Sequence, residues 1–161
     1  MKRKKSGFTL IELVIVIVIG SILTGVALSS FQNVQTRFAV RSAKSMYMTL
    51  HQRARSKAVE YGETVLLLVY TNGDSVLIFS PSQGISDITR FDEQLNVDLR
   101  TQGNASFMMC MTPRGYSDYN CGSYGALGFT QTFADTVRLQ FWLNADSASV
   151  LVLPMGQLVG E

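Results

Sequence analysis

Gly7-Phe8-Thr9-Leu10-Ile11-Glu12 opens an apolar run that extends from Phe8 to Leu28, and Glu12 is the only charged residue in it. A helix of that length covers roughly 31 Å, close to the ~30 Å hydrocarbon core of a bilayer. The run follows a cluster of four basic residues, Lys2, Arg3, Lys4 and Lys5. Such a cluster holds its end of a span in the cytoplasm, so the chain after Leu28 is expected outside the inner membrane.

Glu12 is the unusual residue of this run. A carboxylate inside a membrane span is costly, and an intramembrane acid is by default a candidate functional residue. A buried carboxylate is tolerated when it is paired and hydrogen-bonded. The sequence therefore predicts a partner for Glu12.

Two general interpretations explain only part of this N-terminus. A secretory signal peptide has the basic start, and Ala27-Leu28-Ser29 is a small-x-small cleavage site. The apolar run is too long for such a peptide, however, and an acid has no place in it. An ordinary single-pass anchor explains the length and the basic flank, but neither Glu12 nor the Gly7-Phe8 junction.

The segment from Gly7 to Glu12 resembles the processing site of type IV prepilins and of type II secretion pseudopilins. The resemblance implies that a prepilin peptidase cuts between Gly7 and Phe8 and that Phe8 becomes the N-methylated first residue. It also implies that Glu12 meets the N-terminal amine of a neighbouring subunit in a filament. The first seven residues are then a leader peptide. The resemblance is specific over roughly residues 1–60. The rest of the chain resembles the family only in its order of predicted elements.

The helix is expected to continue from the apolar run to Tyr61, because no Pro or Gly occurs between Val26 and Tyr61. We assign residues 8–30 to a transmembrane and assembly helix and residues 31–61 to its amphipathic continuation. Gly62 is expected to end the helix. The apolar stripe of the continuation recurs at helical spacing and comprises Ala39, Ala43, Met46, Leu50, Ala54 and Ala58.

The amphipathic continuation is basic and the following head is acidic. Residues 31–59 hold no acid and six basic residues, namely Arg37, Arg41, Lys44, Arg53, Arg55 and Lys57. Residues 60–161 hold eleven acids and four arginines. Arg37, Arg41, Lys44 and Arg55 fall together on a face largely opposite the apolar stripe. This basic strip is either a solvated face or a contact for acidic surfaces of neighbouring heads. His51 is expected as a solvated surface residue, whereas Phe31, Val34 and Phe38 are expected to be exposed until neighbouring subunits cover them.

Residues 62–161 are predicted to form a β-rich head. Strand-like runs at 64–70 and 76–79 flank Asn72-Gly73, a strong hairpin signal. Further strands are expected at 95–100, 107–111, 137–144 and 150–153, with a turn at Pro154-Met155-Gly156 and a loop at 81–88. The expected fold class is α+β: a long N-terminal helix whose C-terminal part covers one of two antiparallel sheets, with no second helix.

Cys110 and Cys121 lie in the extracytoplasmic part, where a pair of thiols more often forms a disulfide than a metal or redox site. Their spacing does not match a zinc site, and no catalytic motif is present. We therefore expect neither an enzyme nor a cofactor or metal. The tyrosines near the second cysteine are either a contact surface or internal packing: Tyr116, Tyr119 and Tyr124.

The layout resembles the GspH/FimT type of minor pilin or pseudopilin. It implies a structural subunit that initiates or caps a pilus or a type II secretion filament, with other pilin subunits, the prepilin peptidase and the inner membrane as partners. The alternative is a competence pilin that captures DNA. Some FimT-type proteins bind DNA through a Gly-Arg-x-Arg stretch, but this chain has Gly156-Gln157-Leu158-Val159 there, without either arginine. The acidic head also argues against DNA.

Overall fold

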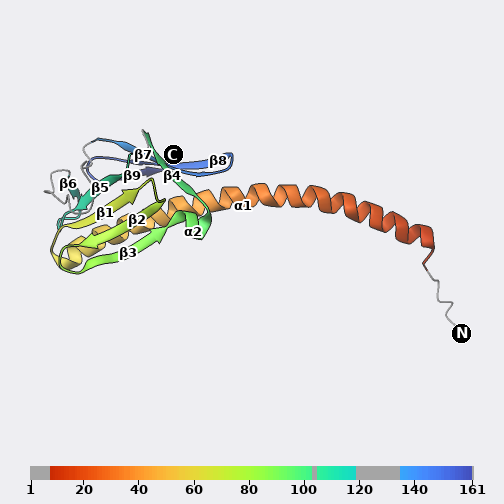
Figure 1. Cartoon of the computed structure of the whole chain (residues 1–161), viewed down its shortest axis with the longest axis horizontal. Coiled ribbons are helices and arrows are strands. Elements are labelled where there is room, and N and C mark those ends of the chain that lie inside the picture. The colour runs from red at the N-terminus through yellow and green to blue at the C-terminus, as the bar shows by residue number, and fades with distance from the viewer. Residues whose placement is uncertain (1–7, 103–104, 119–134, 161) are drawn as a thin grey trace, which may run out of the picture. The chain divides into compact units, whose positions relative to one another are not determined.

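The computed structural model describes residues 8–102, 105–118 and 135–160 (Figure 1). Its first element is α1, Leu10–Tyr61. The chain divides into two compact units, one ending at Gln35 and one beginning at Thr36. The long N-terminal helix and the two antiparallel sheets of the second unit confirm the expected α+β fold.

The first unit consists of the N-terminal part of α1. This part is long and apolar enough to cross a membrane, and none of its most apolar stretch is buried inside the structure. The hydroxyl groups of Ser21 and Thr24 donate to the carbonyls of Val18 and Gly20, at 2.8 and 2.7 Å. Because their hydroxyls are satisfied within the helix, these polar residues are compatible with an apolar surrounding.

The second unit contains the C-terminal part of α1 and two sheets. Gly62 follows the helix with a φ of +65°, the left-handed conformation that commonly ends a helix. The first sheet has the order β3-β2-β1-β5-β6 and the second β4-β7-β8-β9, with all pairs antiparallel. The strands of the first sheet are β1 Val65–Tyr70, β2 Ser75–Ser80, β3 Gly84–Arg90, β5 Phe107–Met111 and β6 Ser117–Asp118. Those of the second are β4 Asp98–Thr101, β7 Val137–Leu143, β8 Asp146–Val152 and β9 Leu158–Gly160.

One continuous core joins α1 to both sheets. The predicted apolar stripe supplies Ala43, Leu50, Ala54 and Ala58, all buried. These pack in the same cluster as residues from the first sheet, such as Leu67, and from the second sheet, such as Phe141 and Val150. Figure 1 shows the C-terminal part of α1 alongside both sheets. The expectation that the helix covers a single sheet is therefore wrong, because its buried face is wide enough for two.

The outer face of the first sheet carries a second, smaller cluster. Leu66, Leu68, Met108 and Cys110 are buried there, with Tyr70, Leu77 and Phe79 packed beside them. Strand β1 is therefore buried on both faces, which explains why its sequence is continuously apolar instead of alternating.

The β1–β2 hairpin is confirmed, but its turn is longer than the Asn72-Gly73 signal suggests. Tyr70 pairs with Ser75, so four residues make the connection, and Asp74 takes a positive φ of 42°. The Asp74 carbonyl accepts from the Phe91 N–H at 2.8 Å, and its carboxylate accepts from the Leu99 N–H at 2.6 Å. Asp74 thus connects the first sheet to β4 of the second sheet.

Two segments differ from the sequence prediction. Residues 84–90, expected as part of a loop, form β3, an edge strand whose Ile85 and Ile88 are exposed. Residues 91–95 form a short helix, α2 (Phe91–Leu95), where no second helix and the start of a strand were expected. Neither segment has a periodic apolar pattern of its own. Pairing with β2 creates β3, and burial of Phe91 in the core fixes α2.

Candidate assembly site and basic groove

Glu12 forms a capping box at the start of α1. The Thr9 hydroxyl accepts a hydrogen bond from the Glu12 N–H at 3.3 Å, and the Glu12 carboxylate accepts one from the Thr9 N–H at 3.3 Å. The Thr9 hydroxyl also lies 3.4 Å from the same carboxylate oxygen. Reciprocal bonds of this kind satisfy two N–H groups that the first turn of a helix leaves unpaired.

Among the described residues, Thr9 is the one hydrogen-bond partner of the Glu12 carboxylate, and Glu12 itself is exposed. The sequence prediction for Glu12 considered only a partner in another subunit and missed this local role. The pattern Thr-x-x-Glu directly before an apolar run is the signal that could have revealed it. Whether Glu12 also pairs with an N-terminal amine stays a prediction.

The large apolar side chains from Phe8 to Leu28 are all exposed. The expected exposure of Phe31, Val34 and Phe38 is confirmed, at 66%, 65% and 71%. Soluble monomers rarely expose a contiguous apolar surface of this extent, which marks a membrane or protein contact. Gly7 and the residues before it lie outside the described residues, so the cleavage site and the methylation of Phe8 stay predictions.

Three basic residues of the predicted strip border a groove in the second unit. Arg37, Arg41 and Lys44 line a hollow of about 350 Å³ together with Asp146 and Ser147 at the start of β8. Asp146 accepts a hydrogen bond from the Thr36 hydroxyl at 2.6 Å and forms an ion pair with Arg37, whose Nε lies 3.4 Å from a carboxylate oxygen. The strip is therefore partly built into the head instead of being uniformly solvated.

His51 is buried, so its assignment as a solvated surface residue is wrong. Its side chain is 1% exposed, and its ring lies 6.5 Å from that of Tyr47, which packs on Phe141 at 6.0 Å. Burial, and then the positive charge of Arg55, lower the pKa of His51 to about 4. Neither ring nitrogen of His51 nor the Tyr47 hydroxyl has a hydrogen-bond partner in the described part of the chain. Its basic sequence neighbours suggested exposure, but the turn of the helix directs His51 to the core.

The predicted cysteine pair is only partly within the described structure. Cys110 is buried in β5, in the cluster on the outer face of the first sheet. Cys121 lies outside the described residues, as do Tyr119 and Tyr124, so the Cys110–Cys121 disulfide and the tyrosine surface stay predictions. Tyr116 is 37% exposed.

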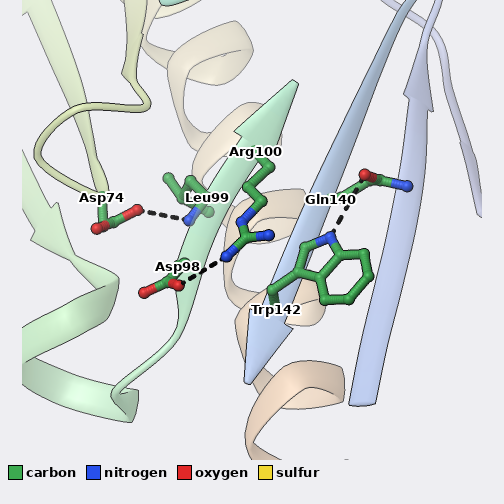
Figure 2. A network of polar contacts seen from close by, with 6 residues as sticks. All are labelled: Asp74, Asp98, Leu99, Arg100, Gln140 and Trp142. Carbon is green, nitrogen blue, oxygen red and sulfur yellow. Dashed lines mark hydrogen bonds and ion pairs between the residues drawn. The ribbon is translucent and has the colours of Figure 1, made fainter. Parts of the chain in front are cut away.

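The outer face of the second sheet carries a polar network around Trp142 (Figure 2). The Arg100 guanidinium lies 5.1 Å from the centre of the Trp142 ring and 3.4 Å from an Asp98 carboxylate oxygen. The Trp142 indole N–H donates to Gln140 at 3.4 Å. Alternation along β4 and β7 brings these side chains to one face, where the cation and the ring partly cover each other.

Two comparisons with known proteins bear on this arrangement. A model of the prokaryotic N-terminal methylation motif matches residues 2–28. Among solved structures, the crystal structure of the type IV minor pilin FimU of Pseudomonas aeruginosa (strain PAO1) is similar, with a TM-score of 0.55 and 12% identity. The alignment covers 78% of this chain and 90% of FimU. No curated protein matches the chain.

At 12% identity the likeness to FimU shows the fold alone, whereas the motif concerns the N-terminus. The motif and the fold together identify the chain as type IV pilin-like, with a long N-terminal helix packed on antiparallel sheets behind a methylation motif.

Proposed function

We propose that this protein is a minor pilin or pseudopilin, a structural subunit that initiates or caps a type IV pilus or a type II secretion filament. The observation that carries the proposal is the exposed apolar part of α1, which has Glu12 in its first turn and lies within the match to the methylation motif. Such a surface needs a membrane before assembly and neighbouring helices afterwards. The function is therefore contact between proteins, and no enzymatic activity is proposed.

The proposal assigns a role to each part of the chain. Residues 1–7 are a leader that a prepilin peptidase removes, and residues 8–30 anchor the subunit in the inner membrane. Residues 31–61 continue the helix, and residues 62–161 form the head on the periplasmic side. In the filament, neighbouring subunits cover Phe31, Val34 and Phe38.

Glu12 has two candidate roles in assembly, and two substitutions separate them. Glu12→Gln keeps an oxygen that accepts from the Thr9 N–H but removes the charge, whereas Glu12→Ala removes both. If Glu12 pairs with the N-terminal amine of a neighbour, both variants should lose most incorporation into filaments sheared from cells. Both should still insert into the membrane, because removing the charge makes the span more apolar.

Thr9→Ala is the matched control, because it weakens the capping box and leaves the charge of Glu12 in place. We expect it to assemble. Mass spectrometry of each membrane-extracted variant should show Phe8 as the first residue, carrying one methyl group. Normal assembly of Glu12→Gln would leave Glu12 with the capping role alone and contradict the pairing.

The competence alternative has less support. Within the described head, Arg90 and Arg100 already pair with the acids Glu93 and Asp98. The lysines and arginines that gather on one surface lie on α1, beside the groove of Arg37, Arg41 and Lys44. DNA capture would therefore depend on the helix and not on the head.

A further inference from the structure

The basic groove has the charge and size of a site for a small anion. Arg37, Arg41 and Lys44 are spaced by four and three residues and so lie on one side of α1. They border a hollow of about 350 Å³ that the start of β8 closes with Asp146 and Ser147. Asp146 is the carboxylate among the described residues that line the groove, and it pairs with Arg37. Arg41 therefore adds a positive charge to this concave surface that Asp146 does not match.

The ion pair with Asp146 orients Arg37 and leaves the Arg41 guanidinium available for a ligand. Asp146 is held by the Thr36 hydroxyl at 2.6 Å and lies 3.4 Å from Arg37 Nε, the inner nitrogen of the guanidinium. Arg41 is exposed and makes no ion pair or hydrogen bond with any residue that the structure describes. A guanidinium recognises phosphate oxygens in pairs, which makes this arrangement suited to a phosphate group.

The position of the groove in the sequence identifies the source of the phosphate. Arg37 follows Leu28, the last residue of the apolar run, by nine residues. Nine residues span about 13 Å as a helix and at most about 30 Å fully extended, so the groove is close to a membrane surface for any orientation of the head. Basic residues directly after a span oppose the positive-inside bias. Each basic residue near the membrane surface, however, raises the affinity for anionic lipids about fivefold.

We propose that the groove of Arg37, Arg41 and Lys44 binds the phosphate group of an anionic phospholipid in the leaflet that faces the head. The inference rests on membrane anchoring as part of the proposed function. The lipid contact orients the head on the membrane before assembly and is released when the subunit leaves the bilayer.

The test measures binding to the full chain in dodecyl maltoside micelles by calorimetric titration. The probes are dihexanoyl phosphatidylglycerol and inorganic phosphate. The lipid should bind at least tenfold more tightly than free phosphate, because it partitions into the micelle around the span and is concentrated beside the groove. Arg37→Gln with Arg41→Gln should weaken lipid binding about 25-fold, since two charges are lost.

Arg55→Gln with Lys57→Gln is the matched control, because it makes the same charge change on α1 among residues that do not line the groove. The control should bind the lipid within twofold of the unchanged protein. Arg41→Lys keeps the charge but loses the paired N–H donors of the guanidinium, so it should bind the lipid more weakly than the unchanged protein. Thermal unfolding in the same micelles checks that each variant is folded, and Arg41→Lys keeps the test valid if the double variant is not.

Three results would overturn the proposal. Equal affinity for free phosphate would make this a site for soluble phosphate. An equal loss in the control would show that only diffuse charge matters. No lipid binding, combined with loss of filament incorporation in the groove variant, would assign the groove to an acidic neighbouring subunit. Because the titration needs no filament, failure of the lipid site leaves the proposed function untouched.

Discussion

His51 is the only histidine of the chain, and burial changes its chemistry. Its pKa is lowered to about 4 in the folded protein, whereas an unfolded histidine titrates near pH 6.5. The folded state therefore keeps a neutral ring at a pH where the unfolded chain takes up a proton. The stability that the neutral ring supports is complete above about pH 6.5 and is lost as the pH falls toward 4.

We predict that the free energy of unfolding of residues 31–161 falls by about 2 kcal/mol between pH 7 and pH 5. Chemical denaturation at a series of pH values measures this change. His51→Leu should remove the pH dependence over this range, and it should not be strongly destabilising at pH 7, because it replaces a ring whose nitrogens have no described partner. A full slope in His51→Leu would assign the pH dependence to other groups.

The state of Cys110 affects the stability of the head, because a disulfide from this residue would add to the free energy of unfolding. Cys110 is buried in the small outer cluster of the first sheet. We predict a bond to Cys121, which non-reducing peptide mapping detects directly. Substituting both cysteines with alanine should lower the free energy of unfolding by about 2–3 kcal/mol on the chain-entropy model. Two free thiols in protein isolated from the periplasm would show that the segment is held by other means.

At the scale of the elements, Gly62 and Gly156 have the same left-handed backbone conformation, but the space around their Cα atoms differs. Gly62 follows α1 with a φ of +65° and has open space where a Cβ would lie, whereas Gly156 precedes β9 with a φ of +73°. A Cβ on Gly156 would lie 2.8 Å from the Cβ of Ser117 in β6. The turn before β9 and strand β6 are thus in direct contact, as the hydrogen bond from the Ser117 N–H to the Met155 carbonyl also shows.

We predict that Gly62→Ala costs about 1 kcal/mol, the strain of a left-handed alanine, while Gly156→Ala costs at least about 2–3 kcal/mol because a steric clash is added. Thermal or chemical unfolding of the two variants measures the difference. Because both substitutions are the same, Gly62→Ala controls for backbone strain. Equal losses would mean that Ser117 and the turn separate at little cost.

At the scale of the whole molecule, the division at Gln35 and Thr36 separates a unit with an exposed apolar surface from one with its own core. We predict that residues 31–161 fold and unfold cooperatively as a soluble protein without Glu12. The same fragment carries the six basic residues of residues 31–59, of which the four arginines are exposed and the two lysines half-buried, so it should bind DNA weakly at physiological salt.

Neutralising those six residues should abolish DNA binding in a mobility-shift assay near physiological salt, because DNA affinity comes largely from lysines and arginines that displace counterions. Thermal unfolding of the neutralised fragment controls for its fold. Tight binding by this fragment would reveal a DNA site in the head, and stacking on exposed tyrosines such as Tyr116 would be its first candidate.

The sequence by itself determined the long helix, because the apolar run, the alanine stripe and Gly62 are local signals that need no other part of the chain. It also determined β5, β7 and the β1–β2 hairpin, whose strands have strong apolar patterns. The same local reasoning would have found the capping box of Thr9 and Glu12, since it depends on residues three positions apart.

Only the tertiary structure decided the features that depend on distant partners. Strand β3 forms because β2 offers an edge, and α2 forms where Phe91 enters the core and Asp74 binds the segments on either side of it. His51 is buried beside Tyr47, which packs on Phe141 of β7, a contact between residues far apart in the sequence. The basic groove exists because β8 places Asp146 against Arg37, a pairing between residues more than a hundred positions apart that no local pattern encodes.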